Sequence, residues 1–401
     1  MSSNRTIAIH TLGCRANQYQ SFTLECQITN DLPAGRHGKS QMNDKCQIVE
    51  FGESADVYLI NTCTVTSDAD KKSRNAIKKA LKLADKVIVA GCSVRLNRDR
   101  LQEEFPTVEF IDASFNSDYP PKIGRKIRVN LMIEDGCENF CSYCIVPFAR
   151  GKIKRKPQED VLSEAIALAD AGAKEIILTG INLGEYGSSA LCSVLRALSS
   201  FPSLLRIRIS SIEPMYITDD LLETMASSPK ICDYMNIPLQ SGDDGLLKSM
   251  KRTYTTSEYS KIIEKVRSWL PACGITTDII VGLPGETDRS FQNTYDFIKK
   301  TGFSRIHIFS YSKRPGTPAA AMPGQVPPNM IKGRYKLLNG LRTELMRAFA
   351  DRHIGREAEV LVERKGEGLT SNYIRVKFDD PADSTGSLQK FTLDPLNIVF
   401  D

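Results

Sequence analysis

The chain has 401 residues, of which 41% are hydrophobic and 25% charged, so it is long enough for two or three folded domains and is not disordered. It has no run of eighteen apolar residues, and its first ten residues lack a secretory signal, so we expect a cytoplasmic protein. Eleven cysteines are too few for a disulfide-stapled fold, and four histidines are few for an imidazole-based zinc enzyme. The net charge is +5, and the excess of cations is concentrated in residues 121–353, which favours a polyanionic partner.

The first third of the sequence alternates strand-like and helix-like stretches. The predicted strands are Thr6–Leu12, Val57–Ile60 and Val87–Ala90. A helix is predicted at Asp68–Leu83, with Ser67 or Asp68 as its N-cap. Such alternation is typical of a parallel sheet covered by helices. Residues 31–46 are polar, contain glycine and proline, and are interpreted as an inserted surface loop.

The alternation restarts at Arg128 and continues for about 190 residues. The predicted strands are Val129–Ile133, Glu175–Leu178, Leu205–Ser210, Tyr234–Ile237, Thr277–Val281 and Arg305–Phe309. Helices are predicted at Pro157–Ala171, Asp219–Ala226, Ser257–Trp269 and Asp288–Lys300. Six such repeats predict a partial (β/α)6 barrel related to the TIM barrel, with its chemistry at the carboxyl ends of the strands.

The C-terminal part changes character after a Gly/Pro-rich linker, Lys313–Pro328, and a basic amphipathic helix that reaches about Ala350. Strands at Glu357–Glu363, Tyr373–Phe378 and Leu388–Thr392 predict a small all-β barrel. The expected fold is therefore α/β with a small all-β domain at its end. The predicted domains span residues 1–122, 123–352 and 353–401.

The strongest local motif is Cys137-Glu-Asn-Phe-Cys141-Ser-Tyr-Cys144, directly after a predicted strand. Three thiolates within eight residues select zinc or an iron–sulfur cluster. A structural zinc site needs a fourth ligand, and none lies nearby in the sequence. Three ligands to a four-iron cluster leave one iron open, which suits a catalytic centre. Three buried core thiols are the alternative, but a polar loop after Gly136 is a poor place for them.

Three further cysteines are dispersed but share a context. Cys14, Cys63 and Cys92 each follow a predicted parallel strand, so all three are expected at the carboxyl edge of one sheet. Together they are candidates for a second cluster, although each taken alone fits an inert buried thiol. The remaining cysteines lie in helical, loop or apolar contexts and are interpreted as structural.

The Cys137–Cys144 loop resembles that of the radical S-adenosylmethionine (SAM) enzymes. In those enzymes the open iron of a [4Fe-4S] cluster chelates SAM. The resemblance implies one-electron cleavage of the sulfonium to a 5′-deoxyadenosyl radical, which abstracts hydrogen from an unactivated C–H bond. The cofactor supplies that step, and the protein positions and shields it.

The order of parts over the whole chain is similar to that of the radical SAM methylthiotransferases. The resemblance implies that Cys14, Cys63 and Cys92 hold a second [4Fe-4S] cluster, which handles sulfur, and that the terminal barrel is an RNA-binding TRAM domain. Cys137–Gly151 and Ser210–Leu221 look most like the members that act on threonylcarbamoyladenosine (t6A) in tRNA, the MtaB type. The implied reaction is 2-methylthiolation of t6A at position 37 beside the anticodon, where single-stranded bases are accessible.

The resemblance also assigns supporting residues, and it implies no catalytic residue beyond the cluster ligands. The expected SAM-binding residues are Gly180, Asn182, Ser210, Glu213, Gly282 and Pro284, although tight turns and a helix-cap neighbour explain several of them as well. A basic run predicts phosphate contact by Arg150, Lys152, Lys154, Arg155 and Lys156, with a solvated surface as an equal alternative. The expected partners are the tRNA anticodon loop, a sulfur donor and an electron donor.

The sequence departs from the family pattern in three places. Asn236 stands where the family usually has histidine, the predicted TRAM segment carries a net charge of −3, and residues 31–46 look like an insertion between Cys14 and Cys63. Three alternatives to the proposed reaction stay open. One alternative substrate is isopentenyladenosine-37 of tRNA, and another is an aspartate of a ribosomal protein. A third alternative, of a different class, is a non-catalytic RNA-binding protein stabilised by a metal.

Overall fold

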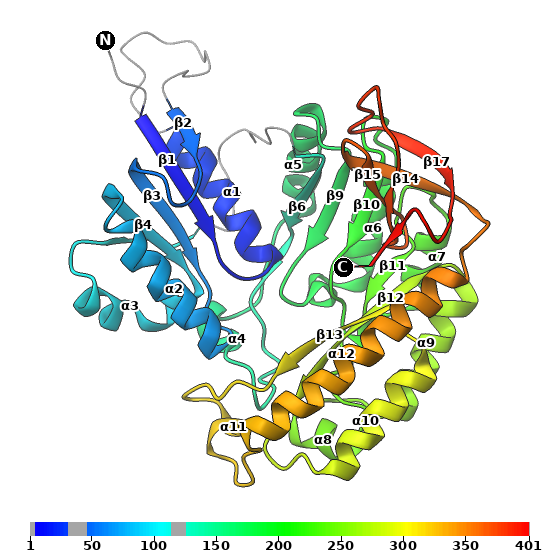
Figure 1. The fold of residues 1–401 in the computed structure, drawn as a ribbon. Helices are drawn as coiled ribbons and strands as arrows, with labels where there is room; N and C mark the ends of the chain where they lie inside the picture. The colour runs from blue at the N-terminus through cyan, green and yellow to red at the C-terminus, as the bar shows by residue number, and fades with distance from the viewer. Residues whose placement is uncertain (1–4, 31–45, 114–125, 401) are drawn as a thin grey trace. The chain divides into compact units, whose positions relative to one another are not determined.

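The structure is a computed structural model and describes residues 5–30, 46–113 and 126–400 (Figure 1). The predicted insertion thus lies, except for Cys46, outside the described residues. Contacts divide the chain into two compact units. The N-terminal unit comprises Met1–Lys122, Asp135–Asn139 and Cys144–Lys154. The barrel unit comprises Ile123–Glu134, Phe140–Tyr143 and Arg155–Asp401.

A five-stranded parallel sheet in the order β2-β1-β3-β4-β5 forms the centre of the N-terminal unit. Its strands are β1 Arg5–Thr11, β2 Cys46–Val49, β3 Ala55–Thr62, β4 Ala84–Gly91 and β5 Glu109–Phe110. The three predicted strands are confirmed. The edge strands β2 and β5 escaped prediction because they are only four and two residues long and carry little hydrophobic pattern.

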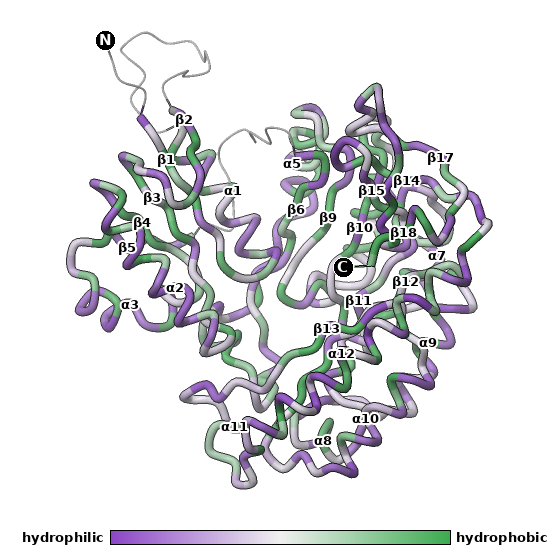
Figure 2. Tube along the Cα trace, in the orientation of Figure 1, coloured by the Kyte–Doolittle hydropathy of each residue, from purple (hydrophilic) through white to green (hydrophobic). Residues whose placement is uncertain are grey.

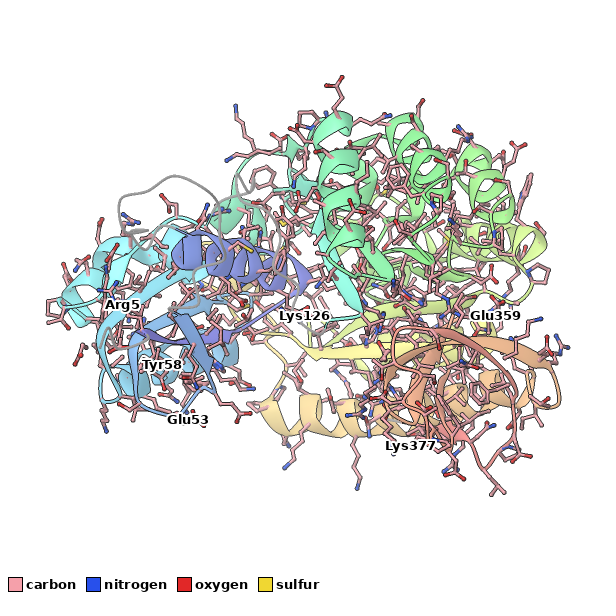
Figure 3. All side chains as sticks on the ribbon, turned by 90° about the horizontal axis from the view of Figure 1, so that it is seen from above. Arg5, Glu53, Tyr58, Lys126, Glu359 and Lys377 are labelled. Carbon is pink, nitrogen blue, oxygen red and sulfur yellow. The ribbon has the colours of Figure 1, made fainter. Side chains whose placement is uncertain are left out.

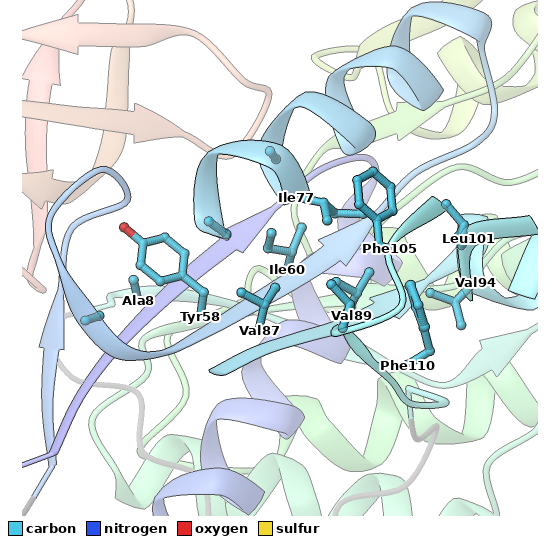
Figure 4. Packing of buried hydrophobic residues seen from close by; sticks show 14 residues of the cluster. Ala8, Tyr58, Ile60, Ile77, Val87, Val89, Val94, Leu101, Phe105 and Phe110 are labelled. Atoms are coloured by element: carbon cyan, nitrogen blue, oxygen red, sulfur yellow. The ribbon is translucent and has the colours of Figure 1, made fainter. Parts of the chain in front are cut away.

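Helices cover both faces of this sheet: α1 Arg15–Asn30, α2 Ser67–Ala80 and α3 Cys92–Glu104. Side chains alternate between the faces of a strand, so Ile60 and Val89 pack with α2 and α3, while Leu59 and Ile88 pack on the α1 side. Figure 4 shows the first of these clusters around Ile77. The middle of each central strand is accordingly apolar, whereas polar residues lie toward the strand ends (Figure 2).

Side-chain hydrogen bonds fix the ends of two elements in this unit. Tyr58 donates to the carbonyl oxygen of Glu53 and accepts from the N–H of Gly52, which holds the turn before β3 (Figure 3). The N-cap of α2 is Thr66, whose hydroxyl accepts from the N–H of Ala69 at 3.1 Å. The predicted caps, Ser67 and Asp68, were therefore wrong by one and two residues, because Thr66 has the extended backbone that a cap requires.

Six parallel strands build the barrel unit in sequence order. They are β6 Arg128–Met132, β9 Glu175–Thr179, β10 Arg206–Ile209, β11 Tyr234–Asn236, β12 Gly274–Val281 and β13 Arg305–Ser310. Two three-stranded sheets, β10-β9-β6 and β11-β12-β13, are joined by single parallel bridges such as Ser211 to Asn236. The predicted partial barrel and all six of its predicted strands are confirmed. A short pair, β7 Glu134–Asp135 and β8 Lys154–Arg155, flanks the cysteine loop.

Helices connect the barrel strands (Figure 1). The α-helices after β6 are α4 Val146–Arg150, α5 Gln158–Asp170, α6 Ser188–Ser199, α7 Asp219–Ala226, α8 Asp244–Ser249, α9 Thr256–Trp269, α10 Asp288–Thr301, α11 Pro318–Ala321 and α12 Pro328–Asp351, with 3-10 turns η1 Leu183–Tyr186 and η2 Pro214–Tyr216. Thr255 and Thr287 cap α9 and α10 in reciprocal capping boxes. Within the described part of the chain, no helix has the length and apolar character needed to cross a bilayer.

An antiparallel five-stranded sheet in the order β17-β14-β15-β16-β18 closes the chain. Its strands are β14 Glu357–Arg364, β15 Glu367–Thr370, β16 Arg375–Lys377, β17 Leu388–Thr392 and β18 Ile398–Val399. The predicted all-β character is confirmed, although β15 and β18 were not predicted. Strand β15 follows β14 through a tight turn at Gly366 (φ 72°), which separates the two strands by only two residues.

Buried arginines attach this sheet to the amino-terminal ends of the barrel strands. Arg206 donates to the carbonyl oxygens of Leu369 and Glu359, both at 2.6 Å. Glu175 lies between Arg208 and Arg128, and these two cations hold the pKa of its carboxyl group at about 2, against the effect of burial. The sheet therefore belongs to the barrel unit by its contacts. The division into three domains stays a prediction.

Candidate active site

Cys14, Cys63 and Cys92 meet at the carboxyl edge of the N-terminal sheet. Cys14 follows β1, Cys63 follows β3, and Cys92 follows β4. The amide oxygen of Asn17 lies 3.8 Å from the sulfur atoms of both Cys14 and Cys92. A β-carbon on Gly13 would lie 3.1 Å from the sulfur of Cys63, so glycine is needed for this approach. The structure thus brings the three thiols together, and their role as ligands stays a prediction.

Arg150 lies beside these thiols and not at the surface. Its Nη1 donates to Asp135 Oδ1 at 2.7 Å, its Nη2 donates to Asn17 Oδ1 at 2.5 Å, and the same Nη2 lies 4.0 Å from Cys14 Sγ. Only 1% of its side chain is exposed. Arg150 is therefore engaged by buried partners, and its predicted contact with an RNA phosphate stays a prediction.

The protonation of these thiols depends on two opposed effects. Burial raises the pKa of Cys63 to about 11 and also raises the pKa of Cys92. The positive charge of Arg150 acts in the other direction on both thiols, since it favours the thiolate form. The site therefore contains a fixed cation, Arg150, that lowers the cost of making buried thiolates.

The Cys137–Cys144 loop is held by backbone contacts on each side. In the N-terminal unit, the N–H of Cys137 donates to Gly151 O at 3.2 Å, and a β-carbon on Gly136 (φ 100°) would collide with Lys152 O at 2.3 Å. In the barrel unit, Ser142 donates through its N–H to Met250 O at 3.1 Å and through its hydroxyl to Ser249 O at 2.7 Å. The division between the units thus runs through the loop, with Cys141 on the barrel side.

A second buried arginine lies beside Cys141 in the barrel unit. Arg252 Nη1 is 3.4 Å from Cys141 Sγ, its Nη2 pairs with Glu213, and its Nε donates to Tyr254 Oη at 3.0 Å. The Tyr254 hydroxyl in turn donates to Pro238 O, which fixes the ring. Loss of solvation raises the pKa of Glu213, although Arg252 opposes that shift. Glu213 is therefore engaged by Arg252, and it also occupies the N-cap of η2.

The loop after β9 presents a buried amide without partners. Glu134 accepts hydrogen bonds from the N–H groups of Ile181 and Asn182, both at 2.8 Å, and a β-carbon on Gly180 would lie 2.6 Å from the same carboxylate oxygen. Both polar atoms of the Asn182 side chain and the hydroxyl of Ser210 are buried, and none has a hydrogen-bond partner among the described residues. Such orphaned groups are costly unless a ligand satisfies them.

The turn after β12 is already held by protein groups. The N–H of Gly282 (φ 84°) donates to Glu286 Oε2 at 2.7 Å, and the same oxygen pairs with Arg334 at 2.6 Å. Pro284 is buried in this turn. The Gly282 N–H is thus already engaged, and the SAM-binding role of Gly282 and Pro284 stays a prediction.

Asn236 is the centre of a polar network between β10, β11 and β12. Its Nδ2 donates to Ser211 Oγ at 2.6 Å and to Asp278 Oδ2 at 3.1 Å, and its Oδ1 accepts from Thr276 at 2.8 Å. Burial raises the pKa of Asp278 to about 6, and the charge of Glu213 adds to this shift. Asn236 thus supplies a hydrogen bond to the carboxylate but, unlike histidine, cannot supply a positive charge.

The remainder of the basic run divides into exposed and buried residues. Lys152, Lys154 and Arg155 are exposed, and Arg155 also pairs with Glu185. Lys156 is 3% exposed and pairs with Glu164. Lys156 is therefore held in a buried ion pair, and its predicted RNA contact stays a prediction.

Two family models match the chain over most of its length. The Radical SAM superfamily matches residues 132–298, and the family described as Uncharacterized protein family UPF0004 matches residues 6–112. The chain is 35% identical to the threonylcarbamoyladenosine tRNA methylthiotransferase MtaB of Bacillus subtilis over an alignment 431 positions long. The alignment covers 96% of this chain and 93% of that protein. The chain belongs to the radical SAM methylthiotransferases.

Other relatives of this methylthiotransferase differ in the name of their substrate. The MtaB of Thermotoga maritima is 34% identical and covers 93% of this chain and 91% of its own length. A tRNA-2-methylthio-N(6)-dimethylallyladenosine synthase of Nocardia farcinica is 35% identical and covers 90% of this chain and 78% of its own length. The solved radical SAM methyltransferase TsrM of Kitasatospora setae shares the fold, with a TM-score of 0.56, 14% identity and coverage of 79% of this chain and 77% of that one.

Membership of the radical SAM family implies SAM and a [4Fe-4S] cluster, and the residues of this methylthiotransferase fit both. Three closely spaced thiols are suited to an iron–sulfur cluster with one open iron. The unsatisfied side chains of Asn182 and Ser210 suit a polar ligand such as SAM. Over the described residues, no group of three Cys, His, Asp or Glu side chains has the arrangement of a single-ion site. Ligation by the six cysteines therefore stays a prediction.

Several site residues of the methylthiotransferase were not predicted from the sequence. Arg252 lies more than a hundred residues from Cys141, so no local motif connects them. Asn17 and Asp135 could have been predicted from the sequence, because Asn17 is three residues after Cys14 and Asp135 is two residues before Cys137. A polar residue on the first turn after a candidate ligand is the signal that would have identified Asn17.

Proposed function

We propose that this methylthiotransferase converts t6A at position 37 of tRNA into its 2-methylthio derivative. The observation that carries the proposal is the nearly full-length similarity to two proteins named for this reaction, at 35% and 34% identity. Alignment covers 93% and 91% of those proteins but 78% of the dimethylallyladenosine synthase of similar identity. Agreement in length as well as identity favours the t6A substrate over the dimethylallyl one.

The two cysteine sets support a reaction that uses two clusters. We assign Cys137, Cys141 and Cys144 to the cluster that binds SAM, and Cys14, Cys63 and Cys92 to a second cluster for sulfur insertion. The adenine C2–H bond has no acidic proton, and the bound cluster and SAM supply the one-electron chemistry that acid–base catalysis lacks. The convergence of the second trio around Asn17 supports the presence of that second site.

The roles of the remaining residues are to bind and orient. We assign the unsatisfied Asn182 amide and Ser210 hydroxyl to polar groups of SAM, with Gly180 allowing the close approach of Glu134 that holds this loop. Arg252, fixed by Glu213 and Tyr254, holds a positive charge 3.4 Å from the sulfur of Cys141.

The exposed cations Lys152, Lys154 and Arg155 follow the cysteine loop and are assigned to the tRNA backbone. The acidic C-terminal sheet makes RNA contact there dependent on single basic residues. A tRNA substrate places the reaction in the cytoplasm, with a sulfur donor and an electron donor as further partners.

Anaerobic reconstitution followed by mass spectrometry of tRNA digests tests the proposal. The purified chain is incubated with SAM, reductant and a sulfur source, using one tRNA that carries t6A-37 and another that carries isopentenyladenosine-37. The proposal expects the 2-methylthio product only on the first. Product on the second tRNA alone, or on neither tRNA while a ribosomal-protein aspartate is modified, would refute it.

Metal content separates the enzyme from a non-catalytic zinc protein. The proposal expects brown protein with close to eight irons per chain, as two four-iron clusters require. Cys63→Ala should lose about half of this iron. Cys26→Ala is the matched control, because Cys26 is a buried thiol of the same unit outside both sets. Stoichiometric zinc in colourless protein would contradict the proposal.

A further inference from the structure

The guanidinium of Arg150 is enclosed within the N-terminal unit. Asp135 Oδ1 accepts from it at 2.7 Å, and Asn17 Oδ1 accepts from it at 2.5 Å. The side chains of Arg150 and Asp135 are 1% and 2% exposed. Water therefore contributes little to the stabilisation of this charge, and the protein groups around it must do so.

The charges around Arg150 do not balance without the thiols. Arg95 pairs with the other oxygen of Asp135 at 3.2 Å, and its side chain is 19% exposed. Two arginines thus share one carboxylate, which leaves one positive charge in excess. The atoms next to that excess are Cys14 Sγ, 4.0 Å from Arg150 Nη2, and Cys92 Sγ, which shares the Asn17 oxygen.

A buried cation in excess is unfavourable unless an anion lies beside it. Thiols are neutral, but thiolates that ligate iron are anionic, and three of them exceed the charge of a four-iron core. The excess charge at Arg150 is buried and lies 4.0 Å from Cys14 Sγ, so it has the sign and the position that would balance such an anion.

We propose that Arg150 is a positioning residue of the second cluster site, where its fixed charge stabilises Cys14, Cys63 and Cys92 as thiolate ligands and raises the reduction potential of the cluster they hold. This inference rests on the proposed function, because it requires that second cluster. Asp135 and Asn17 hold the guanidinium in place. The proposal distinguishes Arg150 from a purely structural ion pair, which would affect folding but not the cluster's potential.

The test isolates the second site in the full chain by replacing Cys137, Cys141 and Cys144 with alanine. In this background Arg150→Gln, Arg150→Lys and Asp135→Asn are reconstituted anaerobically with iron and sulfide. Iron per chain, the rate of iron loss to a chelator, and the midpoint potential from an electron paramagnetic resonance titration are measured. Arg100→Gln, on the exposed side of α3 in the same unit, is the control for charge alone.

Arg150→Gln should weaken iron retention by about tenfold, as loss of a group supporting metal ligands does, and lower the potential. Arg150→Lys should recover part of both effects, because it keeps the charge but not the planar fork. Asp135→Asn removes negative charge and should shift the potential upward. Misfolding cannot produce opposite shifts from the two partners of one ion pair.

The outcomes separate the inference from the proposed function. If the background protein itself holds no cluster, the second cluster is absent and the proposed function fails with it. If the background protein holds a cluster and Arg150→Gln keeps the same iron content and potential, the role of Arg150 alone is refuted. Equal shifts in Arg100→Gln would also refute it.

Discussion

Each of the two cysteine regions has a buried arginine beside a cysteine sulfur, but the balance of charge around the two arginines differs. In the N-terminal unit, Arg150 lies beside Cys14 and Cys92, and in the barrel unit Arg252 lies beside Cys141. Around Arg150, a second arginine shares the single carboxylate of Asp135. Around Arg252 the ratio of arginines to carboxylates is reversed. Glu213 pairs with Arg252, and the carboxylate of Asp278 interacts electrostatically with both.

The charge that the protein places beside its thiols therefore has a different sign in the two regions. The N-terminal unit gathers three thiols and supplies positive charge in excess. In the barrel unit, Cys141 is the one cysteine of the Cys137–Cys144 loop that is present. There the two carboxylates of Glu213 and Asp278 outnumber Arg252, and both have raised pKa values. An excess of carboxylates suits a cationic ligand, and SAM carries a sulfonium and an ammonium group.

The largest effects are expected when a cysteine of either set is replaced, because each set is assigned to a different cluster. Cys141→Ala should reduce SAM cleavage to background and leave the N-terminal cluster in place, because that residue is assigned to the first cluster only. Cys63→Ala should spare SAM cleavage and stop formation of the methylthio product. Both are measured by chromatography of SAM products and of tRNA digests. Normal product from Cys63→Ala would show that the second trio is incidental.

Removal of one carboxylate tests the charge balance in the barrel unit. Glu213→Gln removes the carboxylate that pairs directly with Arg252, whose side chain is 4% exposed, so the free energy of unfolding should fall by about 3 kcal/mol. Urea titrations of the apo-protein measure it. Asp220→Asn is the control, because Asp220 pairs with Arg196 at the surface and its loss should not be measurable. Equal effects from both variants would contradict this account.

The pH dependence of stability tests the raised pKa of Asp278. Its pKa is about 6 in the folded chain against 3.8 for an ordinary aspartate, so the folded state binds the proton more tightly. The stabilisation is therefore complete below about pH 4 and is lost as the pH rises through about 6. Compared with Asp278→Asn, the natural chain should lose about 3 kcal/mol across this window in urea titrations. Parallel profiles of the two proteins would show that the carboxyl group titrates normally.

The smallest effect is expected at the exposed cations after the cysteine loop. Lys154→Gln should lower the slope of log affinity for tRNA against log salt by about one, because one phosphate contact is lost. Lys299→Gln, an exposed lysine on α10, changes the charge equally and should leave the slope unchanged. Filter binding at several salt concentrations measures both slopes. If the two lysines have the same effect, the basic run is only a solvated surface.

Much of the fold followed from local pattern. The apolar runs that became β3 and β12 were recognisable because buried parallel strands are apolar along their length. The short strands β5 and β18 were not, because two residues carry no periodicity. The convergence of Cys14, Cys63 and Cys92 was also predictable, since residues that follow neighbouring parallel strands share one edge of the sheet.

The basic run shows the limit of such reasoning. Five cations in seven residues look equivalent in the sequence, yet Arg150 and Lys156 are buried in ion pairs while Lys152 and Lys154 are exposed. Their partners Asp135 and Glu164 lie fifteen and eight residues away, and Asn17 lies farther still. Local composition indicates charge, but burial depends on which distant groups the fold brings near.

The sequence by itself determined the kind of chemistry, because the spacing of Cys137, Cys141 and Cys144 and the places of Cys14, Cys63 and Cys92 after strands are properties of the chain order. Only the tertiary structure decided which charges act on those thiols. Arg150 and Arg252 reach them through contacts that span more than a hundred residues. Electrostatic energy depends on distance in space and on exclusion of water, and neither is encoded in the local pattern of a sequence.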